Sequence, residues 1–203
     1  MAKPVLVAYT TYAGSTKDVA QAIAEELSKG GVAVELRTLE EVTALDGFAA
    51  AVIGAPMILG WHRQARRFVH QHEKALIQMP VAYFVTAMAL TQTAEAQVDG
   101  VPVSIDPGLA KPPQQAGKLS LRERFTLLPR YVRPILKAAP GVKPVSIGLF
   151  KGRLEFYRLK ILPLLFTMLV IRAQPGDFRN WPVIRAWGAG LYPLLGLNDL
   201  KNE

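Results

Sequence analysis

The fold is decided by residues 5–20, Val5-Leu6-Val7-Ala8-Tyr9-Thr10-Thr11-Tyr12-Ala13-Gly14-Ser15-Thr16-Lys17-Asp18-Val19-Ala20. The apolar run predicts a buried strand, and the hydroxyl-rich segment after it predicts a short loop that opens a helix. Such a loop directs the first free N–H groups of the helix at whatever lies above the strand. Gly14 lets the backbone approach a ligand closely. The stretch therefore predicts a phosphate cradle with the hydroxyls of Thr10, Thr11, Ser15 and Thr16.

The same loop also has a purely structural interpretation. Serine and threonine often cap the first turn of a helix without any ligand. The loop alone leaves both interpretations open. The loops that follow the other strands have to decide between them.

The composition is typical of a protein with a sizeable core. Half of the 203 residues are hydrophobic and 20% are charged, which excludes a disordered chain. The absence of cysteine excludes disulfides, thiolate metal sites and cysteine nucleophiles. No signal peptide is predicted, and the longest uncharged apolar run, residues 161–171, is shorter than the roughly 20 residues that span a bilayer. We therefore expect a cytoplasmic protein.

The positive charge is concentrated in one segment. Of the 24 Lys and Arg residues, 13 lie in residues 111–172, together with only two acidic residues, Glu123 and Glu155. This asymmetry predicts an anionic partner: a lipid surface, an acidic protein or an acidic substrate. Nucleic acid is not expected, because no recognition module is present. A contact with an anionic membrane through residues 111–172 would place the protein at the inner face of the membrane.

Strand and helix patterns alternate along most of the chain. Buried strands are predicted at residues 48–54, 81–86 and 145–150, and a partly exposed one at 32–36. Apolar spacing predicts helices from about residue 15 to 29, over 154–172 and over 181–195. A further helix is expected over 64–78, with Phe68, Val69, Leu76 and Ile77 facing inward. This alternation predicts a parallel sheet covered on both faces.

The alternation fails in residues 91–144, which we interpret as an insertion between the fourth and fifth strands of a single domain, residues 1–203. The turn signal Asp99-Gly100 predicts a hairpin over residues 97–105. Residues 107–117 are typical of an extended loop. A helix interrupted at Pro129 and Pro134 is expected over 119–139.

Ligands of such sheets bind beyond the carboxyl ends of the strands. The loop after the third strand is unusually apolar, with Met57, Ile58, Leu59 and Trp61 on an expected exposed rim. The loop after the fourth strand, residues 86–90, is small and apolar. An apolar, aromatic surface beside a phosphate cradle suits a flat heterocycle with a phosphate tail. The alternative is that these side chains pack against the insertion.

The loop Thr11–Thr16 resembles the phosphate loop of flavodoxins, Thr-x-Thr-Gly-x-Thr, with Ala13 in place of the second threonine. Four segments in order are similar to a flavodoxin-domain group that includes menaquinone-dependent protoporphyrinogen dehydrogenase. These segments are Thr10–Thr16, Ile53–Gly60, Phe150–Leu154 before the apolar run 161–171, and Pro175–Trp187.

The resemblance implies a flavodoxin-like α/β fold with a doubly wound, five-stranded parallel sheet of order 2-1-3-4-5. It also implies non-covalent FMN, held at the phosphate by Thr11–Thr16, with Ala55–Trp61 and Thr86–Met88 as the two walls around the isoalloxazine. Either Trp61 or Tyr12 would stack on the ring. The expected cofactor-binding residues are Thr10, Thr11, Tyr12, Ala13, Gly14, Ser15, Thr16, Ala55, Pro56, Met57, Ile58, Gly60, Trp61, Thr86, Ala87 and Met88. The flavin carries the redox chemistry, so no catalytic residue is assigned.

Three functions are compatible with these observations. The first is an FMN-dependent oxidoreductase acting on a hydrophobic, acidic, tetrapyrrole-like substrate or on a quinone. The second is an electron-carrier flavodoxin that docks a redox partner protein, although carriers of this family are usually strongly acidic. The third is a flavin-free interaction module.

Other uses of this fold lack their key residues. A receiver domain needs an acidic pair after the first strand, where this chain has Thr10-Thr11, and a low-molecular-weight phosphatase needs cysteine. No Walker or dinucleotide-binding glycine motif is present. No metal site is expected, and His62, His70 and His72 are interpreted as surface histidines. The apolar helix 154–172 is either buried against the sheet or lies in a membrane interface.

Overall fold

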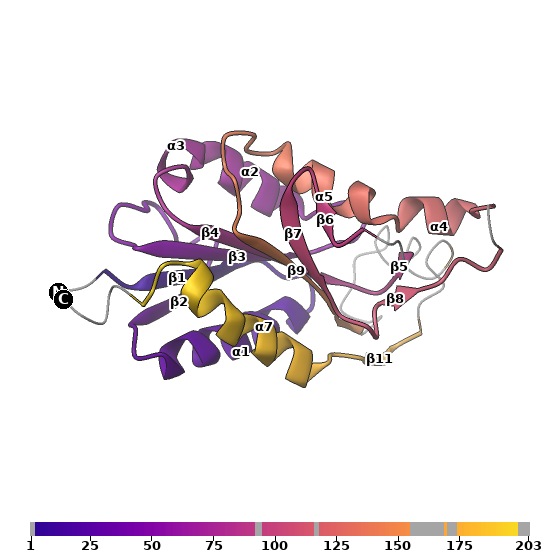
Figure 1. Cartoon of the computed structure of the whole chain (residues 1–203), viewed down its shortest axis with the longest axis horizontal. Coiled ribbons are helices and arrows are strands. Elements are labelled where there is room, and N and C mark those ends of the chain that lie inside the picture. Colours follow the sequence, from indigo (N-terminus) through magenta and orange to yellow (C-terminus); the bar gives the residue numbers. More distant parts are fainter. Residues whose placement is uncertain (1–2, 92–94, 116–117, 155–168, 170–173, 199–203) are drawn as a thin grey trace.

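A computed structural model describes residues 3–91, 95–115, 118–154, 169 and 174–198 (Figure 1). Five parallel strands form the centre of the sheet in the order β2-β1-β3-β4-β9. Their bounds are Val34–Thr38, Val5–Tyr9, Ala50–Pro56, Val81–Ala87 and Ser146–Lys151. This is the predicted 2-1-3-4-5 order, and the fold expectation is confirmed.

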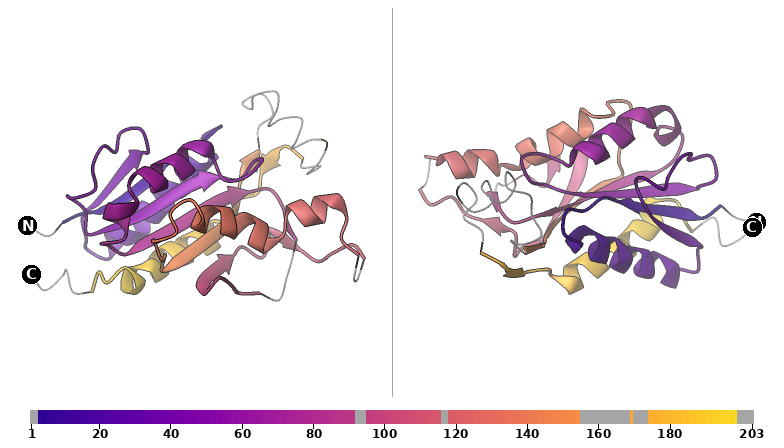
Figure 2. Two further views of the ribbon diagram at one scale, coloured as in Figure 1. Left: turned by 90° about the horizontal axis from the view of Figure 1, so that it is seen from above. Right: turned by 180° about the vertical axis from the view of Figure 1, so that it is seen from behind.

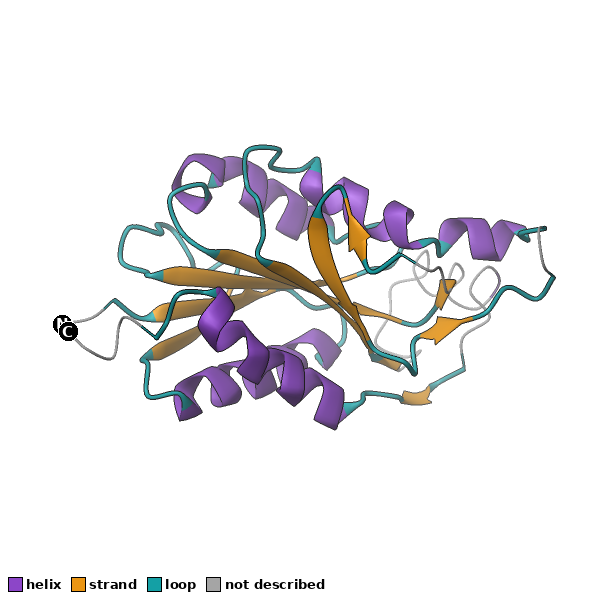
Figure 3. Ribbon diagram, viewed as in Figure 1, coloured by secondary structure: helices purple, strands orange, loops and turns teal. Residues whose placement is uncertain are grey.

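The sheet separates two apolar cores. Val5 and Val7 of β1 face one core, and Leu6 and Ala8 face the other, as the two-residue period of a strand requires. Helices α1 (Ser15–Lys29) and α7 (Trp181–Leu194) cover the first face. Helices α2 (Arg63–Gln71), α3 (Glu73–Leu76) and α5 (Leu128–Leu136) cover the second. Figure 3 shows these two helical layers on either side of the strands.

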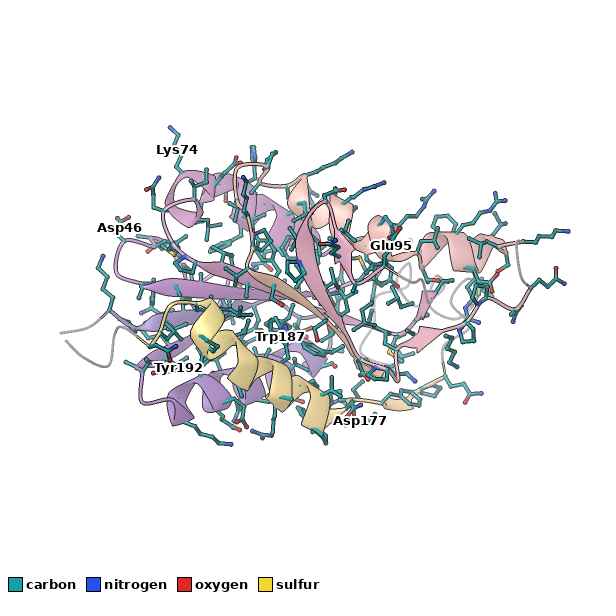
Figure 4. All side chains as sticks on the ribbon, viewed as in Figure 1. Asp46, Lys74, Glu95, Asp177, Trp187 and Tyr192 are labelled. Carbon is teal, nitrogen blue, oxygen red and sulfur yellow. The ribbon has the colours of Figure 1, made fainter. Side chains whose placement is uncertain are left out.

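Helix α7 is attached to the first face by aromatic side chains, two of which are labelled in Figure 4. The indole Nε1 of Trp187 donates to the Ser146 hydroxyl across 3.0 Å, and its ring lies edge-on to Phe84 and Phe150. The Tyr192 hydroxyl donates to the carbonyl oxygen of Gly30 at the end of α1.

The insertion forms the predicted hairpin and extends the sheet. Strands β6 (Gln97–Val98) and β7 (Val101–Ile105) are antiparallel, and β7 pairs in parallel with β9. Within the described residues the sheet therefore has seven strands and not the predicted five, with β6 at its edge. Strands β5 (Leu90–Thr91) and β8 (Ala110–Lys111) form a separate pair. Both views in Figure 2 show the insertion reaching beyond the carboxyl ends of the central strands.

The helices of the insertion begin differently from the prediction. Helix α4 (Leu121–Phe125) opens with a capping box in which Ser120 and Glu123 exchange hydrogen bonds. The helix is interrupted between α4 and α5 (Leu128–Leu136), and not at the two prolines. Pro129 lies in the first turn of α5 and Pro134 lies inside it. The first helical turn has no need of the proline N–H, so Pro129 starts a helix instead of interrupting one.

The helix expected over residues 64–78 is also divided. It breaks at His72, so the helical phase changes and α3 turns Ile77 outward, with 47% of its surface exposed. The inward position predicted for Ile77 is therefore wrong, whereas Phe68, Val69 and Leu76 are buried as predicted. The apolar helix expected over 154–172 lies outside the described residues, apart from Leu154 and Leu169. Within the described chain, no helix has the length and apolar character needed to cross a membrane.

Candidate functional site

The phosphate loop opens helix α1 without a side-chain cap. Gly14 is the N-cap residue and has a φ of 87°, a conformation that favours glycine over any residue with a Cβ. Its N–H donates to the Thr11 hydroxyl across 2.9 Å, and the first intrahelical bond runs from Asp18 N to Gly14 O. The N–H groups of residues 15–17 therefore have no intrahelical acceptor. The ligand-free interpretation of this loop required a serine or threonine cap, and no side chain in the described chain supplies one.

The loop hydroxyls have different partners. Thr10 donates to Gln64 Oε1 across 2.7 Å, and Thr16 shares a 2.8 Å hydrogen bond with Thr86 at the end of β4. The Ser15 hydroxyl accepts from the Arg153 N–H across 2.8 Å, just as the Thr11 hydroxyl accepts from Gly14. A hydroxyl that accepts still has its own proton to donate. Thr11 and Ser15 can therefore donate to an anion in this arrangement, whereas the Thr10 hydroxyl already donates its hydrogen bond to Gln64.

The register of the sheet brings the predicted loops together. Tyr9 pairs with Gly54, Pro56 with Thr86, and Thr86 with Phe150, so the four strands end along one line. A small cavity of about 50 Å³ lies between their loops. Its lining consists of Thr11, Tyr12, Ala13, Ser15, Thr16, Pro56, Met57, Ile58, Thr86, Ala87, Met88, Gly152, Arg153 and Leu154.

A larger, mainly apolar cavity of about 270 Å³ adjoins the small one and shares Met57, Ile58 and Met88 with it. One wall is the loop after β3, the second is the loop after β4, and the third comes from the insertion. The lining residues are Met57, Ile58, Leu59, Gly60, Met88, Ala89, Phe125, Thr126, Arg130 and Tyr131. The two cavities together place the loop hydroxyls and the N-terminus of α1 beside a larger space with three walls.

Comparison with known proteins shows to which family the chain belongs. The flavodoxin domain family matches residues 6–163 of the chain. The protein belongs to the flavodoxin-domain family. No curated protein sequence shows significant similarity to it.

Solved structures of flavodoxins resemble the chain at low identity. A flavodoxin from the domain Archaea is 13% identical, with 95% of this chain and 99% of that chain covered and a TM-score of 0.47. A WrbA-like flavodoxin from Agrobacterium tumefaciens is 14% identical, with 97% and 99% covered and a TM-score of 0.45. A flavodoxin mutant from Fusobacterium nucleatum, bound to flavin mononucleotide, is 16% identical over 43% of this chain and 52% of that chain, with a TM-score of 0.33. The family assignment rests on the sequence match and not on these similarities.

Most of the predicted site residues line the two cavities, but Thr10, Gly14 and Ala55 do not. Trp61 lies elsewhere. Its side chain is 1% exposed and its ring packs 5.6 Å from that of Tyr83 in the core. The exposed rim position expected for Trp61 is therefore wrong, and so is that expected for Met57, which is 7% exposed. Leu59 and Gly60 have φ angles of 58° and 106°, and the bridge between Met57 and Trp61 returns the chain to the sheet. This tight turn directs the indole inward and leaves Leu59 exposed.

Tyr12 is the aromatic residue of the predicted set that lines the small cavity. Its ring lies 4.5 Å from that of His62. His62 caps α2, because its Nδ1 accepts from the Gln64 N–H across 3.2 Å. Burial lowers the pKa of His62, so this neutral acceptor form is favoured near neutral pH. Among the described residues, no group of histidine, aspartate and glutamate side chains is arranged to bind a metal.

An ionic cluster holds the segment that follows β9 beside the phosphate loop. Arg179 donates to Asp18 of α1 across 2.6 Å and also pairs with Asp177. Arg153 lies 3.6 Å from the same Asp18 carboxylate. Strand β10 (Arg153–Leu154) pairs with β11 (Gly176–Asp177), which holds the two arginines on one side of α1. The arginine hydrogen bond lowers the pKa of Asp177 and keeps it ionised.

Gly152 and the insertion residues were not part of the predicted site. A Cβ at Gly152 would lie 3.3 Å from Ser15 Oγ, so glycine allows β9 to approach the phosphate loop this closely. Both Gly152 and Arg153 lie in the segment Phe150–Leu154, which is similar to the family pattern and is the sequence signal for this part of the site. Phe125, Arg130 and Tyr131 had no such signal, because the insertion does not follow the alternation of the sheet.

Proposed function

We propose that this flavodoxin-domain protein binds FMN and acts as an oxidoreductase on a hydrophobic, acidic substrate or a quinone. The observation that carries the proposal is the uncapped N-terminus of α1, opened by Gly14 directly beside a cavity that leads into an apolar one. Helix N-termini bind phosphate through free N–H groups and the helix dipole. The family match supports FMN in particular, since the Fusobacterium flavodoxin is bound to flavin mononucleotide.

The residues present fit such a cofactor. The N–H groups of residues 15–17, with the hydroxyls of Thr11 and Ser15, would hold the phosphate. The walls formed by Met57–Gly60 and Met88–Ala89 would hold the flat ring system and exclude water from its faces. Bound FMN would supply electron-transfer chemistry, which requires no acid–base pair from the protein. The protein's part is binding, orientation and the electrostatic field around the ring.

The experiment that tests FMN binding is a titration of purified, flavin-depleted protein. We expect the flavin fluorescence and visible absorption bands to change with saturation at one FMN per chain. Riboflavin, which lacks the phosphate, is the matched ligand control and should bind at least tenfold more weakly. If neither compound binds, the redox proposal is wrong and the flavin-free interaction module becomes the better hypothesis.

A second experiment separates an enzyme from an electron carrier. The FMN-loaded protein is mixed with small tetrapyrroles or with quinones, and the change of substrate is followed spectroscopically. An enzyme is expected to turn over many substrate molecules per chain. A carrier would exchange electrons with a flavodoxin reductase but show no turnover.

We also propose that the basic insertion contacts an anionic membrane surface, which would place the protein at the inner face of the membrane. Leu121 and Leu169 are 73% and 68% exposed, and Phe125 is 48% exposed. Lys111, Leu121 and Arg122 of the insertion line one cavity together with Leu169, which follows the insertion in the sequence. Exposed apolar side chains among cations are typical of surfaces that meet anionic lipid. A hydrophobic substrate or quinone would then be available next to the cavity.

A further inference from the structure

The two cavities are lined by positive charge. Among the described residues that form their walls are two arginines, Arg153 in the small cavity and Arg130 in the large one, and no aspartate or glutamate. Arg153 lies beside Asp18, so part of its charge is balanced. Arg130 is the cation of the apolar cavity, where a flat ring would lie.

Arg130 is supplied by the insertion and held at the cavity wall. Its guanidinium carbon lies 5.5 Å from the centre of the Phe125 ring, which lines the same cavity. A cation over an aromatic face is attracted by the ring and restricted in its orientation. Arg130 is an exposed residue, and the contact with Phe125 is what holds its charge beside the apolar cavity.

The helix that carries Arg130 is fixed to the loop after β4. The hydroxyl of the next residue, Tyr131, donates to the carbonyl oxygen of Ala89 across 2.6 Å. Tyr131 is buried, and this burial raises its pKa and keeps the hydroxyl protonated. Thr91 extends the connection, because its N–H donates to the carbonyl oxygen of Thr126 and its hydroxyl bonds that of Thr126. Arg130 and the cavity wall at Ala89 therefore keep a fixed relationship.

We propose that Arg130 sets the electron affinity of the bound flavin by stabilising the negative charge of its reduced form. The inference rests on the proposed FMN site. When an added reductant such as dithionite delivers two electrons and one proton comes from water, the flavin ring system gains one negative charge. A nearby cation in a partly apolar cavity favours that state over the neutral oxidised one. The insertion would thereby favour the reduced, negatively charged flavin, which the acidic surface of an electron carrier would disfavour.

The test compares the dissociation constants of oxidised and reduced FMN for the wild type and three variants. The ratio of the two constants is obtained from the midpoint potentials of bound and free FMN, measured by reduction against a reference dye. For Arg130→Gln we expect reduced FMN to lose about tenfold in affinity relative to oxidised FMN. For a two-electron couple this corresponds to a potential lower by about 30 mV. Arg130→Lys keeps the charge and should retain most of the wild-type ratio.

Arg133→Gln is the matched control, since it removes the same charge from the same helix. Arg133 pairs with Asp99 at 3.5 Å and does not line the cavity. We expect the ratio to change less than threefold in this variant, and the effect of Arg130→Gln to shrink at high ionic strength. No substrate is present, so binding of a substrate carboxylate cannot produce the shift.

The outcomes are distinguishable. An unchanged ratio in Arg130→Gln, with FMN still bound, would overturn the role of Arg130 but leave the proposed function intact. An equal change in Arg133→Gln would show that net charge and not position matters, which also overturns it. If the wild type binds no FMN, the proposed function fails and this inference fails with it.

Discussion

The hydroxyl of Tyr131 donates to the carbonyl oxygen of Ala89 across 2.6 Å and joins the insertion to the loop that follows β4. Because Ala89 and Tyr131 both line the apolar cavity, this hydrogen bond determines the distance between two of its walls. The insertion is therefore a structural part of the candidate flavin site. Its contribution can be separated from general stability by comparison with a second hydrogen bond from a tyrosine hydroxyl to a backbone carbonyl, that of Tyr192.

Removal of the Tyr131 hydroxyl should weaken both the fold and the site. Tyr131→Phe loses a hydrogen bond to a backbone carbonyl, and we expect a loss of about 1 kcal/mol in the free energy of unfolding. FMN affinity should fall several-fold, measured by fluorescence titration. Tyr192→Phe is the matched control, because it removes a hydroxyl bonded to Gly30 O at the distant end of α1. Its stability should fall by a similar amount while FMN affinity stays at the wild-type value.

A negative charge at Gly14 should oppose the binding of phosphate. In Gly14→Asp, the carboxylate would lie at the start of α1 beside the N–H groups proposed to hold the cofactor. We expect FMN affinity to fall by well over tenfold. Gly14→Asn has nearly the same shape and the same tolerance of a positive φ, so it reports the backbone cost alone. Equal affinities for the Asp and Asn variants would contradict the phosphate cradle.

The buried hydroxyls of Thr16 and Thr86 should be energetically coupled. They share a 2.8 Å hydrogen bond between the phosphate loop and the end of β4. Either single change to valine leaves the other hydroxyl buried without its partner, at a cost of about 1–3 kcal/mol. The double variant should cost less than the sum of the two single variants in chemical denaturation. Strict additivity would show that the two hydroxyls do not depend on each other.

Acidification should destabilise the protein through His62. Burial lowers the pKa of His62 in the folded state, so the unfolded chain binds the proton more readily. The contribution of His62 to stability is present above its unfolded pKa of about 6.5 and is lost as the pH falls toward the folded pKa. His62→Asn keeps an acceptor at the N-cap of α2 but does not titrate. Urea unfolding between pH 7.5 and 5 should therefore show a shallower loss of stability in this variant, and burial of His72 accounts for part of the remainder.

Contact with lipid should depend on both charge and exposed apolar side chains. We expect the protein to co-float with vesicles that contain anionic phosphatidylglycerol but not with neutral phosphatidylcholine vesicles. Leu121→Gln should lower the bound fraction about fivefold, since a leucine that enters the interface loses contact with water. Leu194→Gln changes a side chain that is 51% exposed on α7 and serves as the control. Equal binding to both vesicle types would exclude the anionic surface as partner.

The central fold could be predicted because its signals are local. Residues 50–56 and 81–87 are buried on both faces, and their continuous apolar runs indicate this directly. The pairing of β7 with β9 could not be predicted, since the partners are about 40 residues apart. The sequence of residues 101–105 does not indicate which strand it pairs with. Residues 71–73 contain neither proline nor glycine, so the sequence does not indicate the break at His72 or the outward position of Ile77.

The site could be predicted as a set of loops but not as a set of side-chain directions. The apolar character of Trp61 is equally compatible with a cavity wall and with the core, and the turn at Leu59 and Gly60 decides for the core. The hydroxyl of Thr10 has the right chemistry for phosphate, yet it donates its hydrogen bond to Gln64, which is distant in sequence. The arginine of the apolar cavity comes from a segment without sheet periodicity, so only the three-dimensional arrangement places Arg130 there.

The two added strands also change how the sheet ends. Without β7, the whole length of β9 would present unpaired N–H and C=O groups on one side, and such an edge can recruit a strand from another molecule. In this protein β7 pairs with Ile147, Gly148 and Leu149 of β9, and the last strand of the described sheet is β6, which is only two residues long. A two-residue edge offers too few hydrogen bonds to start a ladder. The insertion therefore gives the sheet a short edge strand, and deleting it would leave one side of β9 unpaired as well as open the cavity.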